Sequence, residues 1–237
     1  ALQEAWDNAV EVEGFAKLGL GQNISVKGTA ATADKNGTVQ VDTNMVGVAL
    51  DAEGKILWGK IDVAQQKIGF DATGAKAGDV DVRTKVEKEG DYGMKGVSAI
   101  GKEYFEQAKA YTEWMTGKTV AEVLEMPTYE RDASHTACPD VEELKASCTI
   151  SMSAFLEALQ KAYDNAVETT GVPAKTGLGI VVDATVADED AENEKGASAQ
   201  IDTTIAAIAL DEAGVVVASQ IDTAQQKVAF DLEGVAG

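Results

Sequence analysis

The sequence of 237 residues is poor in several residue types: it has two cysteines, three prolines, one histidine and only 5% aromatic residues. No apolar run approaches the ~20 residues that a bilayer-spanning helix needs, so we expect no transmembrane segment. Two-histidine metal sites are excluded, and a Ser-His-Asp triad would have to use His135. The motifs GxGxxG, GxxxxGKS/T, HExxH and GxSxG are missing as well. We therefore expect no catalytic residue, no metal ligand and no enzyme.

Basic residues are also scarce, because 20 lysines and arginines stand against 40 aspartates and glutamates, a formal net charge of −20. A surface of this charge repels phosphate backbones and anionic lipid headgroups. We therefore expect neither nucleic acid nor a membrane surface as a partner, and the partner stays unknown. The acidic residues are spread along the chain, which is typical of a solubility function. Even the acidic stretch at 188–194 lacks the ligand order of an EF-hand and is interpreted as a solvated turn.

The chain opens at Ala1 without an initiator methionine, which indicates a processed or trimmed polypeptide. A removed signal or lipoprotein leader is compatible with this start. Cys138 and Cys148 are close in sequence, and a single close pair fits an oxidising compartment. A disulfide between them would require the chain to turn back just before Asp140. Two free thiols are the alternative.

The strongest pattern in the sequence is an internal repeat. Residues 40–74 and 200–234 are identical at 16 of 35 positions at a constant offset of 160. Two shorter upstream matches keep the same order: 19–21 with 177–179, and 5–11 with 162–168. Three ordered blocks of this kind indicate a duplication.

Each copy predicts one helix followed by antiparallel strands. Apolar residues recur at helical spacing from Phe155 to Val167 and, in truncated form, from Leu2 to Val10. Tight turns that end in Gly54 and Gly214 predict hairpins. The expected strands are 39–50, 56–61 and a short one at 68–70, with counterparts at 201–210, 215–221 and 228–230.

Residues 75–152 have no second version and predict mostly helix. We expect helices at 100–115 and 139–146, and a short helix between them that opens on a capping box of Thr119 and Glu122. The sequence thus predicts an α+β fold with two repeated helix-plus-antiparallel-sheet units in pseudo-twofold symmetry. The units would be 1–74 and 153–237, with the helical intervening segment 75–152 between them.

The best-preserved stretch of the repeat reads Asp-x-Ala-Gln-Gln-Lys. Its amides and lysines are candidates to bind a polar ligand. They are Gln65, Gln66 and Lys67 in the first copy and Gln225, Gln226 and Lys227 in the second. Their presence in both copies favours a structural role, at a strand kink or at the interface between the copies. Asp42 and Asp202 are duplicated as well and are interpreted as part of solvated strand faces.

Two stretches carry a family resemblance. Residues 91–95 read Asp-Tyr-Gly-Met-Lys, and 103–108 read Glu-Tyr-Phe-Glu-Gln-Ala; the hairpin at 46–56 follows the pattern V-x-V-x-x-D-x-x-G-K-I. On these residues the sequence resembles the extracytoplasmic FMN-binding-type lipoproteins of Gram-positive bacteria. The resemblance implies an extracytoplasmic location, secreted or anchored at the cell surface by a lipid. It also implies tandem domains, and FMN carried by the Thr or Ser of an S/D-G-A-S/T motif before the C-terminal helix.

The place that matches this motif is 146–150, where Thr149 carries over and Ser147 and Cys148 replace the glycine and alanine. Because glycine lets the backbone approach a phosphate, its loss predicts that any FMN is bound noncovalently. Under the resemblance, the flavin site would lie near Thr149, with Ser151, Ser153 and Lys145 as further donors at a helix start. The other interpretation is that Thr149 and Ser151 only start and cap that helix.

The sequence therefore predicts a noncatalytic extracytoplasmic binding protein related to the FMN-binding lipoproteins. Its ligand stays open between noncovalent FMN, another planar molecule and none. Two alternatives are kept: an extracellular electron-transfer protein that carries FMN, and a structural or adhesive surface module.

Overall fold

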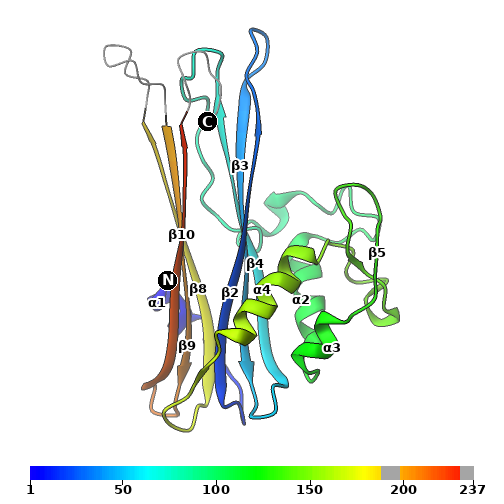
Figure 1. The fold of residues 1–237 in the computed structure, drawn as a ribbon, viewed down its shortest axis with the longest axis vertical. Helices are drawn as coiled ribbons and strands as arrows, with labels where there is room; N and C mark the ends of the chain where they lie inside the picture. The colour runs from blue at the N-terminus through cyan, green and yellow to red at the C-terminus, as the bar shows by residue number, and fades with distance from the viewer. Residues whose placement is uncertain (188–197, 230–237) are drawn as a thin grey trace.

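The computed structural model describes residues 1–187 and 198–229, which form an α+β fold dominated by antiparallel sheet. Two four-stranded sheets run along the molecule side by side (Figure 1). The first sheet has the order β4-β3-β2-β7 and the second β1-β8-β9-β10. The long strands are β2 (Lys17–Thr29), β3 (Gly37–Leu50), β4 (Ile56–Phe70), β8 (Lys175–Ala187), β9 (Ser198–Leu210) and β10 (Val216–Ala229). Two-residue strands, β1 (Val10–Glu11) and β7 (Val167–Glu168), complete the sheets.

The strands are longer and more continuous than their patterns predicted. The return strand and the expected short third strand are one strand, β4 in the first sheet and β10 in the second, and Phe230 lies outside the described residues. Residues 62–67, for which the sequence left a strand kink or an interface between the copies open, continue the ladder opposite 40–45. Main-chain hydrogen bonds carry a strand through polar positions that interrupt its hydrophobic pattern. Strands β2 and β8 were not expected, since glycines such as Gly19 and Gly177 weaken a strand signal.

The hairpin turns match the sequence-based expectation. Gly54 and Gly214 adopt positive φ angles of 85° and 80°. Each glycine ends a turn that begins with an aspartate. The glycine N–H donates to the carbonyl of Asp51 (3.2 Å) or Asp211 (3.0 Å).

The stretch of chain that follows β4 and precedes the helix at 153–164 is only partly helical. Helices α2 (Tyr104–Met115) and α3 (Val120–Leu124) are present, and α3 opens on the expected capping box. The helix predicted at 139–146 is wrong: this stretch contains the single turn η2 (Glu142–Leu144). Just before it, β6 (Cys138–Pro139) pairs with β5 (Thr128–Tyr129), which draws the chain into a small hairpin. A further single turn, η1 (Glu89–Tyr92), lies before α2.

The helices cover the sheets crosswise. Helix α1 (Leu2–Asp7), which precedes the first sheet in the chain, packs on β8 and β9 of the second sheet. Helix α4 (Ser153–Asp164), which precedes the second sheet, packs on β2 and β3 of the first. The short strands that follow these helices are exchanged in the same way, since β1 pairs with β8 and β7 pairs with β2. Each half of the chain therefore completes the sheet of the other half.

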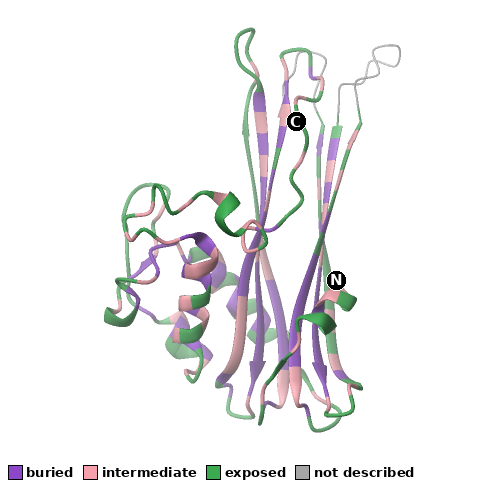
Figure 2. Ribbon diagram, turned by 180° about the vertical axis from the view of Figure 1, so that it is seen from behind, coloured by how far each residue is buried: buried purple, intermediate pink, exposed green. Residues whose placement is uncertain are grey.

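Three apolar clusters define the layers. The largest lies between the sheets and joins side chains such as Leu18 and Val41 to Leu178 and Ile205. The second lies on the outward face of the first sheet, under α2, α3 and α4. The third is small and holds α1 against β9. Figure 2 shows the buried stretches along the strands of both sheets, and Figure 1 shows α2, α3 and α4 together on one side of the molecule.

Among residues 1–187 and 198–229, no helix is long and apolar enough to cross a membrane, as the sequence predicted.

Glycines allow the exchanged helices to lie directly on the strands. A Cβ added at Gly21 of β2 would overlap the carbonyl oxygen of Ala158 in α4, and one at Gly19 would overlap that of Ala162. On the other sheet, Gly177 and Gly179 leave the same room for α1.

We therefore expect Gly21→Ala to destabilise the protein by about 1–3 kcal/mol, the usual range for overpacking against a rigid neighbour. The matched control is Gly28→Ala on the same strand, where the nearest atom to the new Cβ would be 3.8 Å away. Urea unfolding of both variants measures the difference. Equal free energies of unfolding for the two variants would contradict the close packing of α4 on β2.

Candidate functional site

A pocket of about 360 Å³ lies on the outward face of the first sheet, where α4 begins. We call it the sheet pocket. Its floor consists of Ser25 and Lys27 from β2, Asp42 and Asn44 from β3, and Val63 and Gln65 from β4. Its walls consist of Lys85, Tyr92, Met94, Tyr104, Ser134, His135, Ile150, Ser151, Ser153, Ala154 and Phe155. The pocket therefore brings together side chains from the sheet, from both sides of η1, and from the segment that leads into α4.

Asp42 organises the floor of the sheet pocket. Its carboxylate accepts hydrogen bonds from the amides of Gln40 (2.6 Å) and Gln65 (2.7 Å). The ammonium of Lys27 lies 3.8 Å from the same carboxylate. The carboxylate is buried and its oxygens are used by these partners, so the floor presents amide and ammonium groups rather than a free negative charge.

Lys85 supplies a positive charge at the wall. Its Nζ lies 5.2 Å from the ring centre of Tyr92 and 5.3 Å from that of Tyr104. Among the described residues, no carboxylate lies within ion-pair distance of it. Burial lowers the pKa of Lys85, while the negative charge of Asp42 acts in the opposite direction. A partly buried cation over aromatic faces is attracted by the rings but keeps its capacity to bind an anion.

The two tyrosines form an edge-to-face pair, with ring centres 5.8 Å apart and an interplanar angle of 68°. Tyr104 is 3% exposed, and in the part of the chain that the structure describes its hydroxyl has no hydrogen-bond partner. Burial raises the pKa of Tyr104 well above its usual value, so the hydroxyl stays protonated and can donate. A buried hydroxyl without a partner is uncommon, because leaving it unpaired costs about 1–3 kcal/mol.

The first turn of α4 opens at the sheet pocket without a side-chain cap. Its N-cap is Met152, so the interpretation that Thr149 and Ser151 cap this helix is wrong. Ser153, Ala154 and Phe155 of the first turn line the pocket instead. Because the first N–H groups of a helix have no intrahelical partner and the helix dipole is positive there, this end of α4 favours an anion.

Thr149 and Lys145 lie outside the sheet pocket, on a smaller hollow of about 290 Å³ that Cys148 also lines. The backbone N–H of Thr149 donates to Oε1 of Gln107 at 2.8 Å, and its hydroxyl donates to the same oxygen at 3.2 Å. Lys145 is paired with Glu142 at 2.6 Å. Of the four residues expected around a flavin, the structure thus places Ser151 and Ser153 at the sheet pocket and the other two elsewhere.

The residues of the two Gln-Gln-Lys stretches also lie in different environments, and only one of them lines the sheet pocket. Gln65 enters the sheet pocket, whereas Gln66 is fully buried and its amide has no hydrogen-bond partner among the described residues. Lys67 is exposed. In the second copy, Gln225 and Lys227 are exposed and Gln226 is half-buried, and Gln225 donates to Asp202 at 2.7 Å. Alternation along a strand explains the split, because neighbouring side chains point to opposite faces.

His135 also lines the sheet pocket, and it is oriented by a carboxylate. Its Nδ1 lies 2.7 Å from Oδ1 of Asp132, and this hydrogen bond lowers the pKa of Asp132 to about 2. Throughout the described ranges, no serine hydroxyl is hydrogen-bonded to the imidazole. The residues of a Ser-His-Asp triad are therefore not assembled in this structure.

Cys138 and Cys148 are free and buried, so the disulfide weighed from the sequence is not formed here. The thiol of Cys138 donates to the carbonyl oxygen of Thr149 at 3.2 Å. Burial raises the pKa of Cys148 to about 12, which keeps its thiol protonated.

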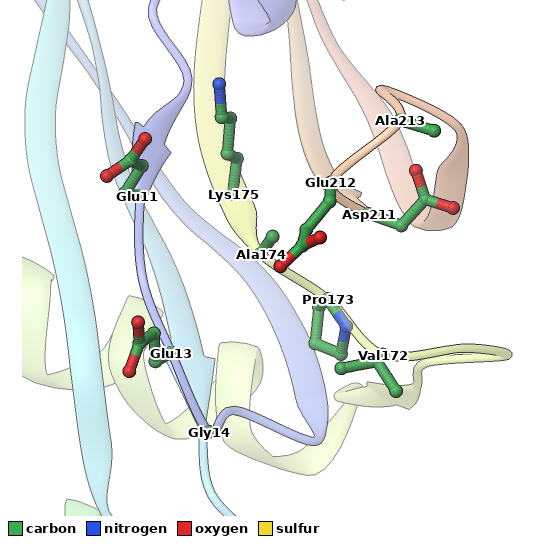
Figure 3. A pocket seen from close by; sticks show the side chains of 10 residues that line it. All are labelled: Glu11, Glu13, Gly14, Val172, Pro173, Ala174, Lys175, Asp211, Glu212 and Ala213. Carbon is green, nitrogen blue, oxygen red and sulfur yellow. The ribbon is translucent and has the colours of Figure 1, made fainter.

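A larger hollow of about 940 Å³ lies at the ends of β1 and β8. Figure 3 shows Glu11 and Glu13 on one side of it and Lys175 and Glu212 on the other. Its polar side chains are mainly carboxylates, and within the described ranges no group of three or more His, Cys, Asp or Glu residues is placed to hold a metal ion. The sheet pocket, which contains opposite charge, aromatic rings and a helix start, is therefore the better candidate.

Sequence reasoning missed Lys85 and Lys27 as site residues, because single lysines in an acidic chain carry no distinguishing pattern. Tyr92, Met94 and Tyr104 do belong to the two stretches that carry the family resemblance. That resemblance was the one signal that pointed to this wall of the pocket.

Comparisons with protein-family models, with curated proteins and with solved structures find no match to this chain.

The buried thiols give a direct test of the segment around Thr149. In the folded protein at pH 8, we expect neither Cys138 nor Cys148 to react with iodoacetamide on the timescale of minutes, since both are buried and thiolate is the reactive form. After unfolding without a reductant, intact mass should increase by two adducts. Absence of adducts in the unfolded protein would show that the cysteines are paired instead.

Proposed function

We propose that this chain is a noncatalytic extracytoplasmic binding protein related to the FMN-binding lipoproteins. Its sheet pocket takes a small anionic ligand with a planar ring, and noncovalent FMN is the first candidate. The observation that carries the proposal is the meeting of two anion-binding groups in one pocket. These are the ammonium of Lys85, which lies over two tyrosines, and the start of α4, which has no side-chain cap among the described residues.

The chemistry of the wall suits a ligand with a ring and a phosphate. The N–H groups of the first turn of α4 favour a phosphate, and the hydroxyls of Ser151 and Ser153 add donors beside them. The half-buried ring of Tyr92 offers an aromatic surface, and the buried ring of Tyr104 packs edge-to-face against it. A volume of about 360 Å³ is at the low end of the range for ligand pockets, so part of a ligand as large as FMN would remain in solvent.

Noncovalent rather than covalent binding is supported by the position of Thr149. Its hydroxyl is buried and donates to Gln107, and it lies on a different hollow from the one that Ser151 and Ser153 line. Attachment of a phosphate to this oxygen would require that hydrogen bond to break and the buried oxygen to become accessible.

We also propose that the two sheet units are duplicated copies in pseudo-twofold symmetry. Matched networks support this: Gln40 and Gln65 donate to Asp42 at 2.6 and 2.7 Å, and Gln200 and Gln225 donate to Asp202 at the same two distances. The reciprocal exchange of α1 and α4 is what a twofold relation between the units would produce.

The test of the binding proposal is a titration of FMN into the purified protein, followed by flavin fluorescence. We expect saturable binding in the micromolar range. Lys85→Met should weaken it on the order of tenfold or more, because a hydrogen bond or contact to a charged group contributes about 1.5–3 kcal/mol.

The control is Lys109→Met, which removes an exposed lysine on α2 that is paired with Glu113 at 3.7 Å. It should leave the affinity unchanged. Equal loss in both variants would show that general charge, and not the sheet pocket, binds FMN. No binding at millimolar FMN would remove the flavin and favour a structural or adhesive surface module.

A further inference from the structure

Asp62 is a buried carboxylate on the edge strand of the first sheet, and its chain neighbour Val63 lines the sheet pocket. It belongs to β4 and is 2% exposed. Its Oδ1 accepts two backbone hydrogen bonds, from Val63 at 2.7 Å and from Val86 at 3.1 Å. The second bond reaches the segment 84–86, which runs along the free edge of β4.

The same segment carries Lys85. The backbone N–H of Lys85 donates to the carbonyl of Val63 at 2.9 Å, and the next N–H, that of Val86, donates to Asp62. Two consecutive hydrogen bonds to β4 therefore fix the backbone from which the ammonium of Lys85 extends over Tyr92 and Tyr104. One of these bonds depends on a side chain, and that side chain is Asp62.

We propose that Asp62 is a positioning residue for the sheet pocket: its carboxyl holds the segment 84–86 on β4 and thereby keeps Lys85 at the pocket wall, and proton binding to Asp62 strengthens this hold. The consequence for ligand affinity rests on the proposed function. The hold on the segment itself does not require any ligand.

The second copy of the repeat shows which contacts of Asp62 come from the repeated sequence and which come from the crossing segment 84–86. Asp222 corresponds to Asp62, and its Oδ1 accepts from the backbone of Thr223 at 2.8 Å, as Asp62 does from Val63. Asp222 is exposed, and its other oxygen accepts from Gln22 at 2.6 Å. The contact with the following N–H is thus common to both copies, whereas the bond to a crossing segment is particular to Asp62. Asp222 is therefore a matched control.

Burial raises the pKa of Asp62 to about 6, against the hydrogen bonds from Thr84, Val63 and Val86, which lower it. The titratable groups that act on it or respond to it are Lys60 on the same strand, Lys85 on the segment and Tyr104 on α2. When the segment opens, water reaches the carboxyl and its pKa returns toward the ordinary value near 4. The held form has the higher pKa, so it binds the proton more tightly. The hold therefore strengthens as the pH falls through 6 and weakens as it rises.

Proton binding has a second effect of the same sign. The negative charge of Asp62 acts on Lys85, and a neutral Asp62 leaves that ammonium free for an anionic ligand. Both effects predict that the sheet pocket binds an anion more tightly below pH 6 than above it.

The first experiment uses the full chain without ligand. Amide hydrogen exchange at Lys85 and Val86 is compared for the wild type, Asp62→Ala, Asp62→Asn and Asp222→Asn. Asp62→Ala should accelerate exchange at these two amides on the order of tenfold. Asp62→Asn keeps an oxygen acceptor, so exchange should stay slow and lose its dependence on pH between 5 and 7.5. Asp222→Asn should behave as the wild type. Unchanged exchange in Asp62→Ala, or an equal effect of Asp222→Asn, would overturn the positioning role.

If Asp62→Ala fails to fold, the comparison of the wild type with Asp62→Asn decides the question. Wild-type exchange at Val86 should slow as the pH falls through 6, after correction for the intrinsic pH dependence of exchange, and Asp62→Asn should show no such change. Identical corrected profiles would overturn the proposal.

The second experiment measures the Kd for FMN at pH 5 and pH 7.5. The phosphate of FMN itself titrates near pH 6, so Asp62→Asn, which meets the same ligand, serves as the reference. The affinity of the wild type relative to this variant should fall about tenfold from pH 5 to pH 7.5, within the limit set by a pKa change of about two units. A flat ratio would overturn the coupling. Absence of FMN binding in every protein, with the exchange result as expected, would reject the proposed function and leave the role of Asp62 standing.

Discussion

The exchange of helices between the two sheets is the constraint on which the rest of the structure depends. Helix α4 reaches β2 because Gly19 and Gly21 leave no side chain in its path, and α1 reaches β8 by the same means at Gly177 and Gly179. This contact buries Phe155, Ala158 and Leu159 in the outer cluster of the first sheet. It also fixes where α4 begins. The first turn of α4, whose N–H groups have no partner within the helix, is thereby brought to the polar half of the strands, where Asp42 and Gln65 form the floor of the sheet pocket.

The polar half of the first sheet exists because the apolar pattern of each strand changes along its length. The outward residues Val46, Val48 and Ile61 lie under the helices. Asp42 and Asn44, which come earlier in β3, and Gln65, which comes later in β4, form the pocket floor instead. The segment after β4 then returns along the free edge of that strand and adds Lys85 and Tyr92 as a wall. A single chain segment thus both protects an exposed strand edge and supplies the cation of the pocket. This dual use connects the stability of the edge to the chemistry of the site.

Much of this architecture could be predicted from particular residues, and the failures have physical reasons. The turns at Gly54 and Gly214 and the capping box of Thr119 were visible because they depend on local sequence. Strands β2 and β8 were missed because their glycines weaken the strand pattern. These glycines leave room for a helix that is more than 130 residues away in the chain, as Gly21 does for Ala158. The split between Gln65 and Gln66, one in the pocket and one between the sheets, follows from strand alternation once the ladder is known to continue. The placement of Lys85 depends on the path of a loop, which no periodicity reveals.

The central claim is that the sheet pocket, and not another surface of this acidic protein, is the ligand site. Mapping of FMN by changes in backbone amide chemical shifts tests it most directly. The account predicts that the changes concentrate at Lys85, Tyr92 and the first turn of α4. The hydrogen-bond network of Asp202 and Gln225 on the second sheet should be unaffected. Shifts that centre on the second sheet, or on the hollow between Glu11 and Lys175, would contradict it.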